Sequence, residues 1–104
     1  MYYTYEEAVS QFGDKLPSRE QFAELQAYCT WTWNGKGFVV KGDNGNSIIL
    51  QATCGNGSYG RYWSADQYKD YNWCGYQLIF SSDQIEVGYI ALRGIKCSVR
   101  LVMN

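Results

Sequence analysis

The side chains that most often carry catalysis are sparse in this chain of 104 residues. It has no histidine, which excludes Ser-His-Asp and Cys-His catalysis and every metal site with histidine ligands. The acidic pairs Glu6/Glu7 and Glu20/Glu24 fall on polar faces of expected helices, whereas glycosidase carboxylates flank a cleft. The string GNGSYG at 55–60 matches G-x-G-x-x-G, but no helix is expected after it. We therefore expect no enzymatic activity and no cofactor.

The four cysteines are the other candidates for special chemistry. Cys29, Cys54, Cys74 and Cys97 contain no C-x-x-C pair, which argues against a zinc site. Residues 1–15 lack the basic start and apolar stretch of a secretory signal, so buried thiols are favoured over disulfides. A Cys54–Cys74 disulfide remains the alternative, because these two residues bracket the most unusual segment of the chain.

Charge and hydropathy argue against two classes of partner. The formal net charge is −1 and the isoelectric point is near 5.2, whereas proteins dedicated to DNA or RNA are basic. No run of about 18 apolar residues is present, so no segment is expected to insert into a membrane. We therefore expect neither a nucleic-acid partner nor membrane insertion.

Aromatic residues make up 17% of the chain and gather in the segment 55–76. This segment combines Tyr and Trp with Gly, Asn, Ser and Asp, and it contains no Val, Ile, Leu, Met or Phe. A segment without aliphatic residues is not expected to form a conventional core strand. Its composition matches antibody contact loops, in which Tyr and Trp supply rigid contact area and small polar residues supply hydrogen bonds. We expect Trp63 to be buried and Tyr68, Tyr71 and Trp73 to face solvent and a ligand. The alternative is an exposed loop with a few half-buried rings.

Two helices are expected in the first third of the chain to support this segment. Thr4 and Glu7 form a capping-box pattern that opens a helix over about 5–12, and Gly13 suits its end. Ser18 and Gln21 repeat the pattern and open a second helix that runs to about residue 28. The apolar residues of the second helix recur at helical spacing and predict one buried stripe.

Short antiparallel strands are expected after the helices. Asn34-Gly35 is a strong turn signal between strands at 30–33 and 37–41. The aliphatic run that ends the strand at 47–50 predicts burial on both faces. Further strands are expected at 75–80, 85–91 and 97–102. Helices followed by antiparallel strands predict an α+β domain.

Four sequence blocks, taken together, resemble a known family. They are LPSREQFAELQAYCTWTW at 16–33, GDNGNSIIL at 42–50, GSYGRYWS at 57–64 and CSVRLV at 97–102. In this order and spacing they resemble the Fibrobacter succinogenes major paralogous domain, which is allied to the C-type-lectin-like variable proteins of diversity-generating retroelements. The resemblance implies a single C-type-lectin-like domain over 1–104, with two helices packed on a small twisted antiparallel sheet and long loops on one face. It also implies a bacterial or phage origin, such as Bacteroides and their phages.

The resemblance also implies where a ligand binds. In the retroelement-linked members, the contacts come from the stretch between the YWS and SVR blocks. The matching residues, together with later ones expected to share their face, are Ser64, Asp66, Tyr68, Asp70, Tyr71, Asn72, Trp73, Asp83, Glu86, Tyr89 and Arg93. Calcium-dependent sugar binding is not expected, because Pro17 is the only proline and lies outside the place of the calcium-binding loop.

These features predict a recognition domain without enzymatic activity that binds a protein or a glycan. The ligand would contact the face rich in Tyr, Trp, Asp and Asn. The resemblance places such a domain on a bacterial cell surface or a phage particle, as a separate protein or as the C-terminal domain of a larger one. The alternative is a structural or assembly module, in which the same face packs against neighbouring subunits or domains.

Overall fold

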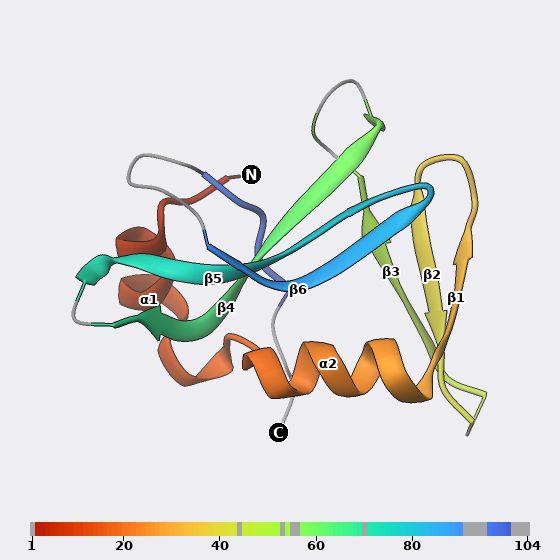
Figure 1. Cartoon of the computed structure of the whole chain (residues 1–104), viewed down its shortest axis with the longest axis horizontal. Coiled ribbons are helices and arrows are strands. Elements are labelled where there is room, and N and C mark those ends of the chain that lie inside the picture. Colours follow the sequence, from red (N-terminus) through yellow and green to blue (C-terminus); the bar gives the residue numbers. More distant parts are fainter. Residues whose placement is uncertain are drawn as a thin grey trace.

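Two helices and six strands form the described part of the chain, which comprises residues 2–43, 45–52, 54, 57–69, 71–90 and 96–100 of a computed structural model. The helices are α1 (Tyr5–Phe12) and α2 (Arg19–Tyr28), with the 3₁₀ turn η1 (Gly13–Lys15) between them. The strands are β1 (Thr30–Trp33), β2 (Gly37–Lys41), β3 (Ser47–Gln51), β4 (Tyr59–Tyr68), β5 (Tyr71–Ser81) and β6 (Gln84–Ile90). They form two antiparallel sheets, β1-β2-β3 and β4-β5-β6 (Figure 1). The expected α+β class is confirmed.

Both helices begin as the capping boxes predict. The Thr4 hydroxyl accepts the Glu7 N–H at 3.2 Å, and the Glu7 carboxylate accepts the Thr4 N–H at 2.9 Å. The second bond also holds the pKa of Glu7 below its usual value. Ser18 and Gln21 make the same reciprocal pair at 3.1 and 2.8 Å. Gly13 ends α1 with φ +49°, a conformation that glycine adopts without strain.

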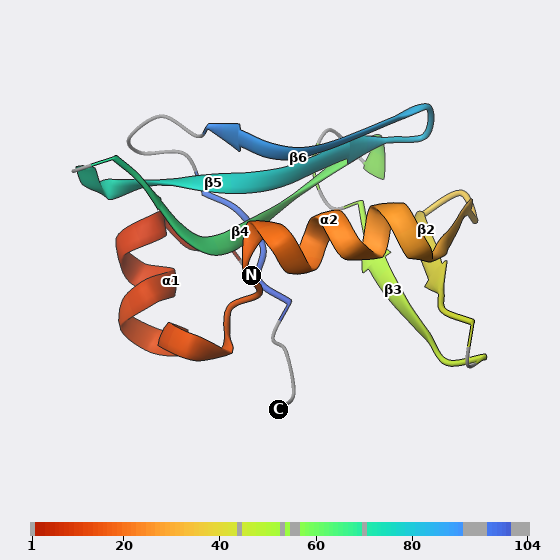
Figure 2. The same cartoon turned by 60° about the horizontal axis from the view of Figure 1, so that its bottom comes forward.

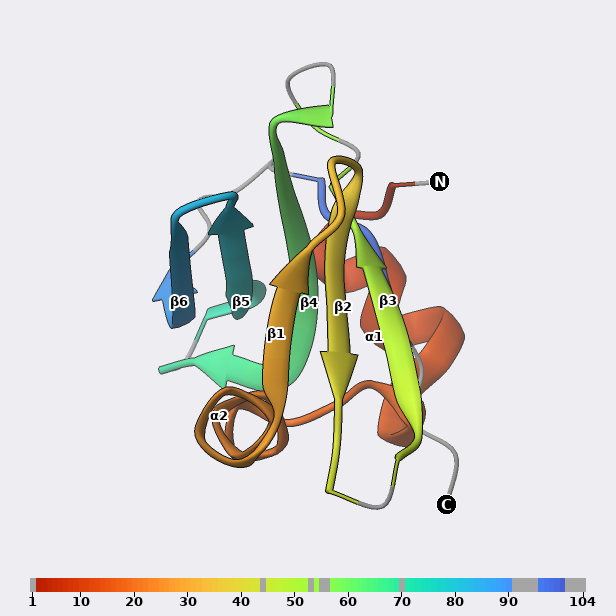
Figure 3. The ribbon, with the colours of Figure 1, turned by 90° about the vertical axis from the view of Figure 1, so that its right-hand side faces the viewer.

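The first sheet is a meander that begins at the end of α2 (Figure 3). Asn34 shapes its first turn, because its side-chain oxygen accepts the N–H groups of Lys36 and Gly37 at 2.9 and 3.0 Å. Burial of β3 on both faces, expected from its aliphatic run, is wrong. Leu50 is fully buried, whereas Ile49 is 49% exposed. Antiparallel strands at the surface cover one face only, and alternate side chains of β3 therefore point outward.

The second sheet corrects the interpretation of segment 55–76. Described residues of this segment form all of β4 and the first half of β5, a long antiparallel hairpin rather than a loop (Figure 2). The absence of aliphatic residues argued against a core strand, but aromatic rings take their place. Tyr62 and Trp63 are 6% and 1% exposed, and the expected burial of Trp63 is confirmed.

Two hydrophobic cores meet at β4, which passes between α1 and α2 (Figure 2). Consecutive residues of a strand point to opposite faces, so Tyr62 joins one core and Trp63 the other. The first core lies between α2 and the two sheets and contains Phe22, Phe38, Val40, Leu50, Ala52, Tyr62, Leu78 and Phe80. The second core lies against α1 and contains Tyr5, Ala8, Leu16, Trp63 and Cys97.

The strand expected at 97–102 is not formed over residues 97–100. Cys97 instead makes an isolated bridge to Tyr3, with N–H···O distances of 2.8 and 2.9 Å. Ser98 bridges the free edge of β4, donating to the Arg61 carbonyl at 2.9 Å and accepting from the Trp63 N–H at 3.1 Å. This short segment ties the N-terminal region to the second sheet without continuing as a strand. Residues 101 and 102 lie outside the described part.

All four cysteines are described, and all are thiols, as expected. The alternative Cys54–Cys74 disulfide is not formed. Cys74 and Cys97 are 2% and 0% exposed, and loss of hydration on burial raises the pKa of both thiols. Such thiols stay protonated near neutral pH, and the thiol of Cys97 donates to the Gln77 side-chain oxygen at 3.1 Å.

Replacement of Gly75 by alanine should destabilise the fold, because a Cβ there would overlap the ring of Tyr5. Overpacking of this kind typically costs about 1–3 kcal/mol of unfolding free energy, measurable by urea denaturation. The same substitution in a Tyr5→Ala background should cost less, since the obstructing ring is gone. Equal losses in the two backgrounds would show that the overlap is not the cause.

Candidate functional site

Three tyrosines gather where β4 turns into β5, and we call Tyr68, Tyr71 and Tyr76 the tyrosine cluster. Tyr68 and Tyr71 are direct cross-strand partners, and their rings stack with centroids 6.0 Å apart. Tyr76 meets Tyr68 edge to face at 5.6 Å. The hairpin brings these rings together because directly opposed residues of antiparallel strands lie within contact distance. Tyr71 is 46% exposed, so the cluster presents aromatic surface to solvent.

Two cations flank the tyrosine cluster. The Arg19 guanidinium lies 3.8 Å from the centre of the Tyr76 ring, and the Lys69 ammonium lies 5.2 Å from that of Tyr68. Asp66 accepts a hydrogen bond from Arg19 Nε at 2.9 Å and thereby fixes the guanidinium over Tyr76. The side chains of this ion pair are 44% and 34% exposed, so the pair contributes little to stability. Its main effect is to hold the rings and charges in one arrangement.

A hollow of about 650 Å³ adjoins the tyrosine cluster, between α2 and the second sheet. Its lining residues are Ser18, Arg19, Glu20, Ala23, Gln26, Asp66, Val87 and Gly88. Arg19 and Asp66 border both the hollow and the cluster. The two features therefore form one continuous surface, aromatic at the hairpin end and polar beside α2. Among the described residues from 66 to 71, none belongs to either core.

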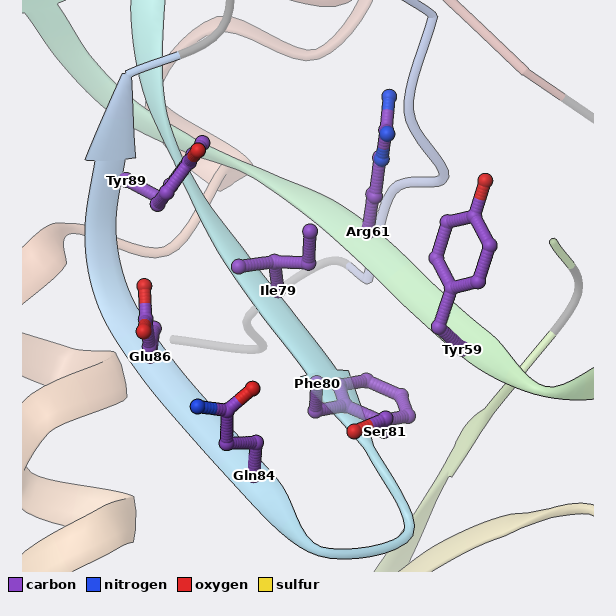
Figure 4. Close-up of a pocket in the computed structure, with 8 residues that line it drawn as sticks. All are labelled: Tyr59, Arg61, Ile79, Phe80, Ser81, Gln84, Glu86 and Tyr89. Carbon is purple, nitrogen blue, oxygen red and sulfur yellow. The ribbon is translucent and has the colours of Figure 1, made fainter. Parts of the chain in front are cut away.

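A second hollow of about 460 Å³ lies on a different face of the second sheet, and we call it the sheet groove (Figure 4). Its lining residues are Tyr59, Arg61, Ile79, Phe80, Ser81, Gln84, Glu86 and Tyr89. Leu78 and Phe80 belong to the first core, so Ile79 between them points to the opposite face of β5. Figure 4 shows Ile79 in the middle, with Arg61 and Tyr59 on one side and Glu86 and Tyr89 on the other.

The structure divides the expected site residues among several places. Asp66, Tyr68 and Tyr71 lie together at the hairpin end. Ser64 is fully buried, where its hydroxyl donates to the Tyr76 carbonyl at 2.7 Å. It therefore holds the two strands together rather than facing a ligand. Ser64 and Asp66 occupy an irregular part of β4, where the pairing register shifts, and this explains why their side chains differ in environment.

The later residues do not share one face with the tyrosine cluster. Glu86 and Tyr89 line the sheet groove. Asp83 lies in the turn between β5 and β6, at the other end of β5 from Tyr71 (Figure 1), and accepts the Ser81 hydroxyl at 2.9 Å. The remaining expected residues fall outside the description: Asp70 and Arg93 entirely, and Asn72 and Trp73 in their side chains.

Sequence reasoning did not place several residues on these surfaces. Tyr76 belongs to the tyrosine cluster and Arg19 lies over its ring, while Tyr59 and Arg61 line the sheet groove. Alternation along β4 is the signal that puts the last two on one face, but it was hidden by the interpretation of the segment as a loop. No local pattern indicates that Arg19 crosses from α2 to reach a ring on β5.

Within the described residues, no three His, Cys, Asp or Glu side chains lie together as a metal site would require. None of the described helices has the length and apolar character needed to cross a membrane. Comparisons with protein-family models, with curated proteins and with solved structures find no match.

Proposed function

We propose that this domain is a recognition module without enzymatic activity, which binds a protein or glycan ligand through the tyrosine cluster and the adjoining hollow. The observation that carries the proposal is the packed set of Tyr68, Tyr71 and Tyr76, in which Tyr71 is exposed and the Arg19 guanidinium lies over Tyr76. We further propose that the fold is a C-type-lectin-like variant that acts on a bacterial surface or phage particle. The four sequence blocks and the order of helices before strands support that assignment.

Preorganisation of the tyrosine cluster favours this function. Each ring is held by another ring or by a cation, so little side-chain entropy remains to be lost when a ligand docks. Tyrosine provides apolar contact area together with a hydroxyl, which suits both protein and glycan surfaces. The charges of Arg19, Asp66 and Lys69 add polar contacts of both signs at the edge of the rings.

Replacement of Tyr71 by alanine should weaken ligand binding by about 30-fold or more, since loss of a contact aromatic at a binding hot spot costs about 2 kcal/mol. Ligands would first be identified by screening the intact chain on glycan and protein arrays. Affinities of the variants would then be measured by biolayer interferometry. The thermal midpoint should stay near that of the unchanged protein, because Tyr71 belongs to neither core.

Tyr28→Ala is the matched control, because Tyr28 is 76% exposed at the end of α2 and lies outside the cluster. It should bind as the unchanged protein does. Equal binding by the Tyr71 variant and this control would contradict the proposal, as would failure of both arrays to reveal a ligand. A stable oligomer in size-exclusion chromatography that buries the tyrosine cluster would favour an assembly module instead.

A further inference from the structure

We propose that the sheet groove is a second binding site, separate from the tyrosine cluster, and that it takes a sugar residue bearing a carboxylate. The carboxylate would pair with Arg61, and the sugar hydroxyls would donate to Glu86 and Gln84 on the opposite wall (Figure 4). The volume of about 460 Å³ lies within the range of about 300–1,000 Å³ that is usual for small-ligand sites.

Strand register places opposite charges on the two walls of the groove. Arg61 on β4 is the partner of Ile79 on β5, which is in turn the partner of Glu86 on β6. Neighbouring strands lie about 4.8 Å apart, so the backbones at Arg61 and Glu86 are roughly 10 Å apart across an apolar floor. No ion pair joins these two described residues. Both charges therefore remain available to a ligand that lies between them.

A buried hydrogen-bond donor of Arg61 without a partner is the most specific support for this site. Among the described residues, its Nε is the buried side-chain nitrogen or oxygen for which no hydrogen-bond partner is present. A buried donor that has lost water without gaining an acceptor costs about 1–3 kcal/mol. The Tyr59 ring lies 5.3 Å from the guanidinium carbon and flanks the group. Nε itself has almost no accessible surface, so a ligand carboxylate in the groove would accept from the two terminal nitrogens of the guanidinium together, a two-bond geometry that this group favours.

An irregularity of β6 at Gly88 shapes the far wall of the groove. Glu86 and Tyr89 are three residues apart and would face opposite sides of a regular strand. A register shift at Gly88, which has φ +85°, places both on the groove side. Tyr89 is consequently 52% exposed at one end, while Tyr59 stands at the other. Aromatic side chains at both ends offer apolar surface to the C–H groups of a sugar ring.

The balance of charge identifies the class of ligand. A cationic ligand would leave Arg61 unpaired, and a neutral sugar would give it only a weak acceptor. A phosphate with two negative charges would bring excess charge toward Glu86, which stands across the groove. A carboxylated sugar carries one negative charge and several hydroxyl donors. It therefore satisfies Arg61 and Glu86 at once.

NMR titration of the intact chain tests this inference with glucuronic acid and N-acetylneuraminic acid as probes and glucose as the neutral comparison. At least one acid should shift the amide signals of groove residues and bind at least about tenfold more tightly than glucose, as expected for a hydrogen bond to a charged group. Arg61→Gln should abolish that preference, and Tyr89→Ala should weaken binding. Arg100→Gln is the matched control, because Arg100 is exposed and does not line the groove.

Arg61→Lys is the conservative variant, which distinguishes loss of binding from loss of folding. It keeps the positive charge but loses the bidentate donor geometry of the guanidinium. Its affinity should lie between those of the unchanged protein and Arg61→Gln. The inference is overturned if neither acid shifts the groove signals, if glucose binds equally well, or if Arg61→Gln folds and binds as before. Tyr71→Ala should leave these titrations unchanged. The proposal for the groove and the proposal for the tyrosine cluster are therefore tested separately, and either can be wrong without the other.

Discussion

Trp63→Ala should lower the free energy of unfolding by about 3–5 kcal/mol, the usual loss when a fully buried tryptophan is truncated. Its side chain is 1% exposed and is the largest in the second core. The ring packs edge-on against Tyr5 at 5.3 Å, and its Nε1–H donates to the Tyr3 carbonyl at 2.7 Å. Truncation would leave a cavity and deprive that carbonyl of its donor. A small domain has only about 5–15 kcal/mol of stability, so this loss is large.

Urea denaturation followed by circular dichroism measures this loss, with Trp33→Ala as the matched control. Trp33 is partly exposed on β1 and packs at the margin of the first core, so its truncation should cost distinctly less. Trp63→Phe should give an intermediate loss, because it retains an apolar ring but not the N–H donor. Similar losses for Trp63→Ala and Trp33→Ala would mean that Trp63 does not anchor the second core.

Raising the pH from about 9 to about 11 should destabilise the fold through Cys97. Burial raises the pKa of its thiol from 9.0 to about 12. Between these values the unfolded chain releases the proton while the folded chain retains it, so the folded state binds more protons and stability falls as pH rises. The slope for one such group is about 1.4 kcal/mol per pH unit. Below pH 9 the contribution is fully present.

Cys97→Ala isolates this effect, because it removes the titrating thiol while leaving a small apolar group. Its unfolding free energy, measured by urea denaturation at several pH values, should fall less steeply above pH 9. Burial also raises the pKa values of Tyr5 and Tyr62, so some alkaline loss should persist in the variant. Identical slopes for the variant and the unchanged protein would contradict the assignment to Cys97.

The helices could be predicted closely because their boundaries depend on local interactions. Thr4 with Glu7 and Ser18 with Gln21 each satisfy backbone groups within one turn, so the pattern in the sequence is also the physical cause. β4 could not be predicted in this way. It lies between two cores, and Tyr62 and Trp63 supply the buried surface that aliphatic residues supply in other strands. Only the tertiary arrangement reveals that role.

In the candidate site too, features that depend on neighbouring residues could be predicted, and contacts between distant segments could not. The exposure of Tyr71 was predictable because polar residues surround it in the sequence, whereas Tyr68, expected to face solvent as well, is half-buried against Tyr71 and Tyr76. The contact of Arg19 with Tyr76 joins α2 to β5 and has no local signature. Glu86 and Tyr89 share a face only because the strand is irregular at Gly88, which simple alternation does not anticipate.

The hairpin end extends beyond both cores, and this gives the molecule a place where its sequence can change at low risk. Because no described residue from 66 to 71 belongs to either core, substitutions there should leave folding nearly intact. Selection could then alter the side chains that this end presents to solvent without first compensating for lost stability. Because substitutions there should leave the fold intact, the hairpin end would also be a suitable place to randomise in a combinatorial library. The helices and the strands around Trp63 would then be kept constant.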